Sequence, residues 1–547
     1  MAARGRGLRR GRRSCRRRHG RRPGGAHRRC GTRRRRSLLR QCRRPAARCR
    51  DRQPAAQGPD RDLRPDLRLQ HRAGAALRHA PGRFVHQQAA AHGRPGGVRF
   101  RRPLRRSHDG HDRLDPRRPA EVQGAHRRRP GGAARAVLRP DARRDLRPGA
   151  GPAGVVTASA AAPGGHPVLD ALNDVLPGIA ARAEEIERAR QLPAEIARML
   201  IETGVFKLCV PAALGGHEAH PLVLMRAIEA ASSADGSTGW NVMIGATSGT
   251  TAAYLAPDAA QLIHGDAKAV TGGIFAPRGK AVRDGDSWRV SGHWQWASGN
   301  SHCRWMKAGC VAWEEGRPRM VREGVPEVLT VYVPRERITF DDNWHTSGLC
   351  GTGSCDMRID DVVVPASHAV SLTRDRPRID GPLYRFPVFG LLALGCGAVA
   401  LGIARGAIED LRTLAGAKVP ALSRRPLAER AGTQSDIARA EALVRAARAF
   451  VVEAITVAWE QAARGTGIGV EDRMALRLAA THATEAAAKA VDICYTLAGG
   501  TSVYRASSLQ RRFRDVHVVT QHMMVAPPSY ELAGRVLVRL PTDASML

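Results

Sequence analysis

The spacing of apolar residues changes twice along this chain, and the change limits the folds that it can adopt. Over residues 166–264 apolar side chains recur at the three-to-four-residue spacing of amphipathic helices. Over residues 265–366 the period falls to two, and turn residues such as Asp284-Gly285-Asp286 separate short runs, as in strands joined by hairpins. Helical spacing returns over residues 382–547. The sequence therefore predicts an α+β multidomain protein with an N-terminal α-helical domain, a central antiparallel β domain and a C-terminal four-helix bundle, in that order.

One apolar run could suggest a membrane span. Residues 386–404 carry no charge, and a run of this length is close to what a helix needs to cross a bilayer. Glycines interrupt the run, and Arg405, Glu409 and Asp410 continue its helical register. We therefore expect a buried bundle helix and no membrane association.

The first 153 residues have a different composition. Residues 1–150 contain 46 arginines, no lysine and 10 acidic residues, a net charge of +36, so that almost all of the +38 of the chain lies there. Low hydrophobicity with high charge predicts disorder. Two explanations remain open: a nucleic-acid-binding arm, or G+C-rich DNA translated ahead of a natural start near Val155-Val156. Because the stretch has almost no aromatic residues for base stacking, we favour the second and expect no nucleic-acid partner.

The cysteines indicate a reducing compartment. Seven occur after residue 150 and none forms a Cys-x-x-Cys pair, and no secretory signal is apparent. His345, Cys350 and Cys355 lie near one another in sequence, but their spacing fits no standard metal site. We expect a cytoplasmic protein with free thiols and no metal.

Residues 291–300 read Ser-Gly-His-Trp-Gln-Trp-Ala-Ser-Gly-Asn and are the strongest candidate for a functional segment. Strand alternation would place Trp294, Trp296 and Ser298 on one face. An aromatic surface beside a hydroxyl group suits a planar cofactor such as a flavin. The same pattern also fits a tryptophan-rich core strand that ends in a Ser-Gly turn, and the segment alone does not decide between the two.

Four motifs in a fixed order give the chain a family resemblance over roughly 380 residues. They are residues 211–216, residues 291–299, the loop 348–354 with the acidic-apolar stretch 360–365 behind it, and Gly499-Gly500-Thr501 ahead of residues 509–515. Together they resemble the acyl-CoA dehydrogenase fold. Within that fold the chain is similar to the flavin-dependent monooxygenases, the oxygenase components of two-component systems such as p-hydroxyphenylacetate hydroxylase and dibenzothiophene monooxygenase.

The resemblance implies an activity, cofactors and partners. It implies that reduced FMN or FAD reacts with O₂ through a C4a-hydroperoxyflavin, which hydroxylates an aromatic or other electron-rich small molecule. It also implies a separate NAD(P)H:flavin reductase and a homotetramer. The chain has no dinucleotide-binding Gly-rich turn after a strand, which agrees with an external source of reduced flavin.

The resemblance also assigns roles to particular positions. His522 and Ser298 would be catalytic, with His522 on the last bundle helix and able to move a proton near neutral pH. Ser248, eight residues after an α-domain tryptophan, would contact substrate. The positions that would bind the cofactor are Trp240, Trp296, Ala297, Ser298, Gly299, Thr352, Gly499 and Gly500.

The chain departs from the family pattern at two positions. Phenol-hydroxylating members carry histidine where this chain has Ser248, which argues against a simple phenol as substrate. Cys350 replaces an arginine in the loop 348–354, which removes a contact for a phosphate or for the loop itself. Two alternatives stay open: an acyl-CoA dehydrogenase with tightly bound FAD, although no convincing glutamate base is present, and a nucleic-acid binder that acts through the arginine-rich arm.

Overall fold

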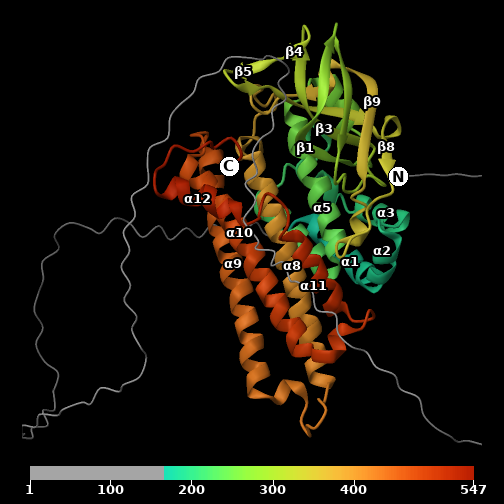
Figure 1. Ribbon diagram of the computed structural model, residues 1–547, viewed down its shortest axis with the longest axis vertical. Coiled ribbons are helices and arrows are strands. Elements are labelled where there is room, and N and C mark those ends of the chain that lie inside the picture. The colour runs from blue at the N-terminus through green and yellow to red at the C-terminus, as the bar shows by residue number, and fades with distance from the viewer. Residues whose placement is uncertain (1–164) are drawn as a thin grey trace, which may run out of the picture. The chain divides into compact units, whose positions relative to one another are not determined.

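The computed structural model describes residues 165–547, so the predictions for residues 1–153 lie outside the described part. Within it, helices come first, a sheet follows and long helices complete the chain (Figure 1). The sheet lies beside the upper ends of the long helices, whose lower ends extend away from it (Figure 1). The predicted order of helical, β and helical regions is confirmed.

The first helical region contains six α-helices. They are α1 (Pro167–Ala181), α2 (Ala183–Ala189), α3 (Ala194–Glu202), α4 (Pro221–Ala234), α5 (Gly236–Ser248) and α6 (Pro257–His264). Helix α5 begins where the sequence indicates, because the carboxylate of Asp235 accepts a hydrogen bond from the backbone N–H of Thr238 at 2.7 Å. This cap fixes the start of the helix that carries Trp240.

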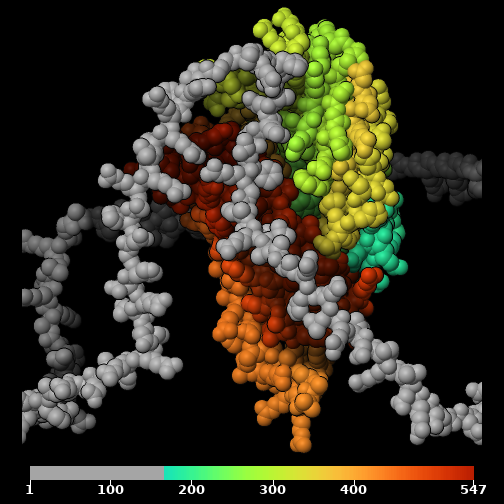
Figure 2. Space-filling model, in the orientation of Figure 1, coloured from blue at the N-terminus to red at the C-terminus, as the bar shows by residue number. Residues whose placement is uncertain are grey.

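The β region is one mixed sheet with a small two-stranded sheet beside it. Its strands are β1 (Thr271–Asp284), β2 (Ser287–Trp294), β3 (Trp305–Glu314), β4 (Arg317–Pro318), β5 (Met320–Arg322), β6 (Val325–Pro326), β7 (Val328–Pro334), β8 (Thr339–Asp341), β9 (Asp356–Pro365) and β10 (Ala369–Val370). The large sheet has the order β10-β7-β3-β1-β2-β9-β8, with β4 paired to β3, while β5 pairs with β6. Figure 2 shows the large sheet as a continuous block of green and yellow atoms.

The connections between strands confirm one prediction and correct another. The β1–β2 hairpin turns at Gly285-Asp286, as the sequence indicates, and Gly285 takes a φ of +56°. Strands β1 and β3 are parallel, so the prediction of an antiparallel domain is wrong for this pair. The reason is a crossover: after β2 the chain passes to the other side of β1, which leaves β3 running in the same direction as β1.

Strand β1 contains a wide bulge. Ile274 pairs with Ala308 and Gly279 pairs with Cys310, so residues 275–278 lie opposite Gly309 alone. The bulge lifts this stretch out of the ladder and turns Phe275 toward Phe389 in the helical bundle, with ring centroids 6.0 Å apart.

The C-terminal region is a bundle of long helices. Its helices are α7 (Pro382–Arg385), α8 (Val388–Ala417), α9 (Ala431–Arg464), α10 (Val470–Ala498), α11 (Ser508–Val519) and α12 (Pro528–Leu537). Helix α8 is long and apolar enough to cross a membrane by length and composition, but 78% of its most apolar window is buried by its neighbours. It packs mainly against α10 and α4 and also contacts α5, α9 and α11, as the central helix of the bundle.

Candidate functional site

The tryptophan pair of residues 291–300 does not lie on one face, and this corrects the strand prediction. Strand β2 ends at Trp294, which is fully buried and donates its Nε1–H to the carbonyl of Gly309 at 2.8 Å. Trp296 follows with a φ of +71°, so the alternation of side chains stops before it, and its side chain is 66% exposed. Trp294 is therefore a core residue, whereas Trp296 is an exposed aromatic ring held by a strained backbone.

The turn after β2 is hydrogen-bonded to the loop before β9. The N–H of Ala297 donates to the carbonyl of Cys355 at 2.8 Å, and the N–H of Gly299 donates to that of Thr352 at 3.0 Å. The side chain of Asn300 adds a bond to the carbonyl of Gly353. Backbone hydrogen bonds therefore hold three of the predicted cofactor positions together, namely Ala297, Gly299 and Thr352.

Three buried hydroxyl groups join these loops to α5 in a chain of hydrogen bonds. Trp240 Nε1 lies 3.1 Å from Ser298 Oγ, Ser298 Oγ lies 2.6 Å from Ser354 Oγ, and Ser354 Oγ lies 2.6 Å from Thr352 Oγ1. Thr352 in turn donates to the carbonyl of Leu349 at 2.8 Å. The indole can only donate, the carbonyl can only accept and each hydroxyl has one proton, so every bond points from Trp240 toward Leu349. Ser298 thus uses its proton on Ser354 and keeps one lone pair free.

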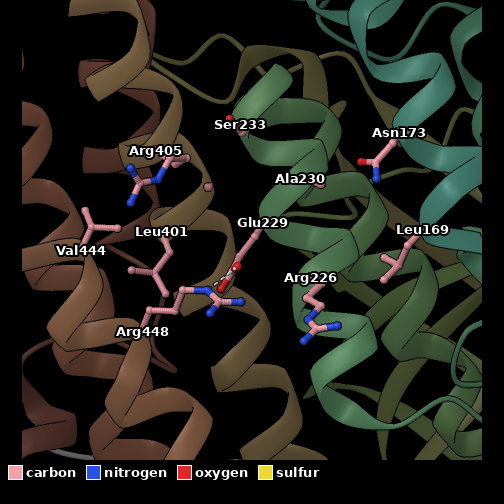
Figure 3. Close-up of a pocket in the computed structure, with 11 residues that line it drawn as sticks. Leu169, Asn173, Arg226, Glu229, Ala230, Ser233, Leu401, Arg405, Val444 and Arg448 are labelled. Carbon is pink, nitrogen blue, oxygen red and sulfur yellow. Dashed lines mark hydrogen bonds and ion pairs between the residues drawn. The ribbon is translucent and has the colours of Figure 1, made fainter. Parts of the chain in front are cut away.

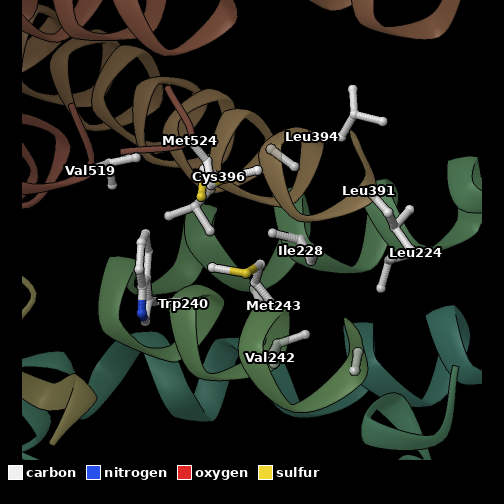
Figure 4. Packing of buried hydrophobic residues seen from close by; sticks show 14 of the residues in the cluster. Leu224, Ile228, Trp240, Val242, Met243, Leu391, Leu394, Cys396, Val519 and Met524 are labelled. Carbon is white, nitrogen blue, oxygen red and sulfur yellow. The ribbon is translucent and has the colours of Figure 1, made fainter. Parts of the chain in front are cut away.

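His522 meets the other side of Trp240. The two rings lie edge to face with centroids 5.4 Å apart, so Trp240 connects Ser298 to His522. Figure 4 shows Cys396, Val519 and Met524 gathered on the same side of α5 as Trp240. His522 follows α11 in the turn ahead of α12, which corrects its predicted place on the last helix of the bundle.

The surroundings of His522 keep its imidazole neutral. Burial, and then the charge of the nearby Arg477 guanidinium, lower the pKa of His522 to about 4. Nδ1 accepts the backbone N–H of Met524 at 3.3 Å, which places the ring proton on Nε2. The predicted proton transfer near pH 7 therefore starts from a neutral ring. His517, five residues earlier, forms a partly exposed hydrogen bond from Nε2 to the Asp492 carboxylate at 2.9 Å.

Two site residues were not singled out from the sequence. Ser354 was noted only as the end of its loop, yet it carries the hydroxyl chain. Asp515 is buried and accepts the N–H of Leu349 at 2.6 Å, which ties α11 to the loop 348–354. Burial, and then the charge of Asp235, raise the pKa of Asp515 to about 7. The sequence does contain one pointer to Asp515, because this residue ends the stretch 509–515, which is part of the motif set that carries the family resemblance.

Ser248 is the last residue of α5, about two helical turns beyond Trp240. Its side chain is buried, and its carbonyl accepts the hydroxyl of Thr251 at 3.0 Å. Thr251 then bonds Tyr332 of β7, whose hydroxyl also lies 3.4 Å from Nε2 of His264. The predicted substrate residue thus borders, through its backbone carbonyl, a second buried polar group made of Thr251, Tyr332 and His264.

Gly499 and Gly500 are not brought near Trp240 within this chain. They begin the short 3₁₀ helix after α10, where Lys418, just past the end of α8, donates to the carbonyl of Ala498 at 2.6 Å. Cys396, which faces His522, lies 22 residues earlier on the same helical axis, a rise of about 33 Å. These glycines cannot touch the same ring as His522 in one chain.

A groove of about 400 Å³ lies between α1, α4, α8 and α9, away from the predicted residues (Figure 3). Its charged lining includes Glu229 and Arg448, which form an ion pair at 2.9 Å, and Arg405, which pairs with Glu441 at 2.6 Å. None of the predicted site residues lines this groove.

Family models match both helical regions. The model described as the N-terminal domain of acyl-CoA dehydrogenase matches residues 175–261, and the model of the C-terminal domain matches residues 394–527. These matches support the predicted fold.

Similar proteins of known activity bear on the choice between a monooxygenase and a dehydrogenase, and those described below are monooxygenases or hydroxylases. An indole-3-acetate monooxygenase of Pseudomonas putida is 32% identical over 384 residues, which cover 69% of this chain and 94% of the relative. The oxygenase subunit HsaA, a flavin-dependent monooxygenase of Rhodococcus jostii, is 27% identical and covers 69% of this chain and 100% of its own length. A crystal structure of the 3-HSA hydroxylase from Rhodococcus sp. RHA1 superposes with a TM-score of 0.63 at 27% identity, over 70% of this chain and 99% of that one. These relatives do not favour the dehydrogenase alternative, and the chain belongs to the flavin-dependent monooxygenases of the acyl-CoA dehydrogenase fold.

Proposed function

We propose that this monooxygenase hydroxylates a small aromatic molecule at a site formed by Trp240, Trp296, Ser298 and His522. The observation that carries the proposal is the position of Trp240, which donates a hydrogen bond to Ser298 and packs against His522. Segments that lie 58 and 282 residues from Trp240 along the chain thus meet at one indole. Reduced FMN or FAD, when bound, supplies the electrons that activate O₂.

The residues present fit a flavin. Trp296 offers an exposed indole face, and holding it there with a positive φ costs about 1–3 kcal/mol, which is typical of functional positions. Asn241, next to Trp240, has a buried Oδ1 without a hydrogen-bond donor among the described residues. A Cβ on Gly299 would lie 3.2 Å from that oxygen, so glycine there keeps the space beside Asn241 open.

Ser298 is oriented for the reduced form of the cofactor. Its proton is committed to Ser354, so the lone pair that remains can only accept a hydrogen bond. N5 of a reduced flavin carries a hydrogen, whereas N5 of an oxidised flavin is an acceptor. We assign Ser298 Oγ to the N5 edge as an acceptor for that hydrogen.

His522 donates a hydrogen bond where Ser298 accepts one. Its Nε2 carries the ring proton, so the neutral imidazole donates a hydrogen bond and can take up a second proton only at Nδ1. We assign His522 to donate a hydrogen bond from Nε2 to the oxygen on which the reaction would develop negative charge, because a neutral imidazole stabilises that charge without releasing its own proton. Ser248 stays a candidate substrate contact, at the border of the second polar group.

Partners and location follow from the same proposal. The relative HsaA is named an oxygenase subunit, so we propose a separate NAD(P)H:flavin reductase as the source of reduced flavin. The seven cysteines in residues 165–547 are free thiols, which supports a cytoplasmic location. Exposed apolar side chains near the C-terminus, among them Leu537, Val538 and Leu540, support self-association as a homotetramer.

The test is turnover with supplied reduced flavin. The purified protein should consume O₂ and form a hydroxylated product from an aromatic panel only when an added reductase and NADH provide reduced FMN or FAD. A protein that purifies yellow and is bleached by an acyl-CoA would instead be a dehydrogenase. Residues 154–547 alone should keep the oxygenase activity; loss of function without the arginine-rich arm would favour a nucleic-acid role.

A further inference from the structure

Strand β3 carries a lysine in the interior of the protein. Lys307 is 1% exposed and pairs across the ladders with Gly273 of β1 and Tyr332 of β7. A lysine is almost never fully buried unless an acceptor pairs with it. Its presence at the centre of the sheet therefore requires an explanation.

No acceptor in residues 165–547 pairs with the Lys307 ammonium. The only partner of Nζ there is the face of Phe275, whose ring centroid lies 4.3 Å away. Lys207, a second buried lysine, provides the contrast, because its Nζ donates to the carbonyl of His264 at 2.8 Å. Of these two buried lysines, Lys207 is satisfied by the protein and Lys307 is not.

The groups around Lys307 do not neutralise it. They are the thiol of Cys303, the phenol of Tyr332 and the imidazole of His264, and no carboxylate of residues 165–547 pairs with Nζ. Burial lowers the pKa of Lys307 to about 7, and only Cys303 acts in the opposite direction. An anion placed beside Nζ would restore the charged form.

The aromatic rings beside Lys307 are in place because of the β1 bulge. Residues 275–278 leave the ladder, which puts the Phe275 ring beside Nζ and in an edge-to-face pair with Phe389 of α8. Both rings are only partly buried although they lie between the sheet and the bundle. An aromatic ligand at these rings would have its polar end within reach of the ammonium.

The surroundings of Lys307 also connect to the predicted substrate position. Tyr332, the cross-strand neighbour of Lys307, bonds Thr251, and Thr251 bonds the carbonyl of Ser248. The bond directions follow from that carbonyl: Thr251 donates to it, so Tyr332 donates to Thr251. Lys307 and Ser248 therefore border the same buried polar group from the sheet and the helix.

We propose that Lys307 is the counter-ion for a carboxylate on the aromatic substrate, with Phe275 and Phe389 against its ring. The assignment rests on the proposed hydroxylase function and narrows its substrate class to aromatic carboxylates. If Lys307 only filled space in the core, the protein would bind a carboxylate and its neutral amide isostere with equal affinity. A counter-ion favours the anion, and loses that preference when its charge is removed.

The experiment compares matched ligands. The full chain, saturated with reduced flavin under anaerobic conditions, is titrated calorimetrically with three pairs: phenylacetate and phenylacetamide, indole-3-acetate and indole-3-acetamide, and benzoate and benzamide. The variants are Lys307→Met and, as the control, Lys280→Met, an exposed β1 lysine whose Nζ also lies over an aromatic ring, 3.7 Å from the Trp313 centroid. Met keeps an unbranched chain of similar length.

We expect at least one carboxylate to bind the wild type about 10- to 100-fold more tightly than its amide. Lys307→Met should abolish this ratio and leave amide binding unchanged, while Lys280→Met should keep it. If no carboxylate is preferred over its amide, or if Lys307→Met keeps the preference, the proposal is overturned.

Two further measurements test the proposal independently of the Lys307 variant and separate it from the proposed function. If Lys307→Met does not fold, the wild type still decides, because carboxylate affinity should fall as pH rises above about 7 while amide affinity stays flat. A pH-independent ratio would then refute the proposal. Hydroxylation of a neutral aromatic, with no carboxylate preference, would leave the proposed function intact, whereas failure to bind reduced flavin would remove that function itself.

Discussion

The indole of Trp240 lies edge to face with the imidazole of His522, 5.4 Å between centroids. The same indole donates its only N–H to Ser298, so that one side chain of α5 positions a residue of the sheet region and a residue of the C-terminal turn. The relative placement of Ser298 and His522 therefore depends on how α5 is held.

Removal of the His522 ring should separate chemistry from binding. We expect His522→Ala to bind reduced flavin as the wild type does and to lower hydroxylation by roughly 10² to 10³, the contribution of one lost hydrogen-bond donor to a developing negative charge. Hydroxylated product and H₂O₂, each measured per reduced flavin consumed, report the effect. His517→Ala removes a nearby histidine whose partner is Asp492 and should leave both yields unchanged. An unchanged product yield in His522→Ala would exclude the ring from the reaction.

Ser354 should set which oxidation state of the flavin binds better. In Ser354→Ala the Ser298 proton loses its acceptor and becomes free to donate to N5 of an oxidised flavin. The preference for reduced over oxidised flavin should fall by about 3- to 10-fold, the worth of one hydrogen bond. Equilibrium titrations with the two forms measure it. Ser347→Ala, an exposed serine of the preceding turn, is the matched control. Equal ratios in wild type and Ser354→Ala would contradict the assignment of Ser298.

The two tryptophans after residue 293 should respond in opposite ways. Trp296→Gly relieves a positive φ, so the stability of the protein should stay level or rise, while flavin affinity should fall roughly 10-fold with loss of the aromatic face. Trp294→Ala removes a buried ring and should cost about 3–5 kcal/mol of unfolding free energy. Thermal unfolding and flavin titration of both variants check this. A Trp296→Gly protein with wild-type flavin affinity would remove Trp296 from the site.

Stability should depend on pH through Asp515. Its pKa is raised from 3.8 to about 7, so the folded protein keeps a proton that the unfolded chain releases over this range. Stability is therefore highest at the acid end of this window and falls as pH rises from about 4 to 7, by at most about 1.4 kcal/mol per pH unit. Asp515→Asn keeps an acceptor for Leu349 and should remove that part of the slope.

Unfolding midpoints at pH 5, 6, 7 and 8 compare the two proteins. Asp258→Asn, at an exposed carboxylate of α6, should follow the wild type. Parallel curves for wild type and Asp515→Asn would contradict a raised pKa.

Local patterns predicted local structure. Asp235 marked the start of α5, and Asp284-Gly285-Asp286 marked the β1–β2 turn, because caps and tight turns depend on neighbouring residues. The predicted alternation of side chains stops before Trp296, because this residue adopts a positive φ and the strand ends there. No residue pattern in the sequence indicates a positive φ at a tryptophan. Helix α12 was not expected, and its short amphipathic pattern follows Pro527-Pro528.

Contacts between distant segments could not be read from periodicity. The parallel pairing of β1 with β3 requires knowledge of the crossover, and the pair Leu349–Asp515 joins positions 166 residues apart. The resemblance supplied His522, Trp240 and Ser298, but it did not supply Ser354 or Lys307, whose roles depend on which atoms surround them in this chain.

The bond from Leu349 to Asp515 has a practical consequence for dissecting the protein. A fragment that stops after the sheet would lack the carboxylate that holds the loop 348–354, and a buried amide without a partner costs about 1–3 kcal/mol. Ser354 would then lose its fixed place beside Ser298. The β region should therefore not be expected to retain cofactor affinity when it is expressed alone, however well its strands pair.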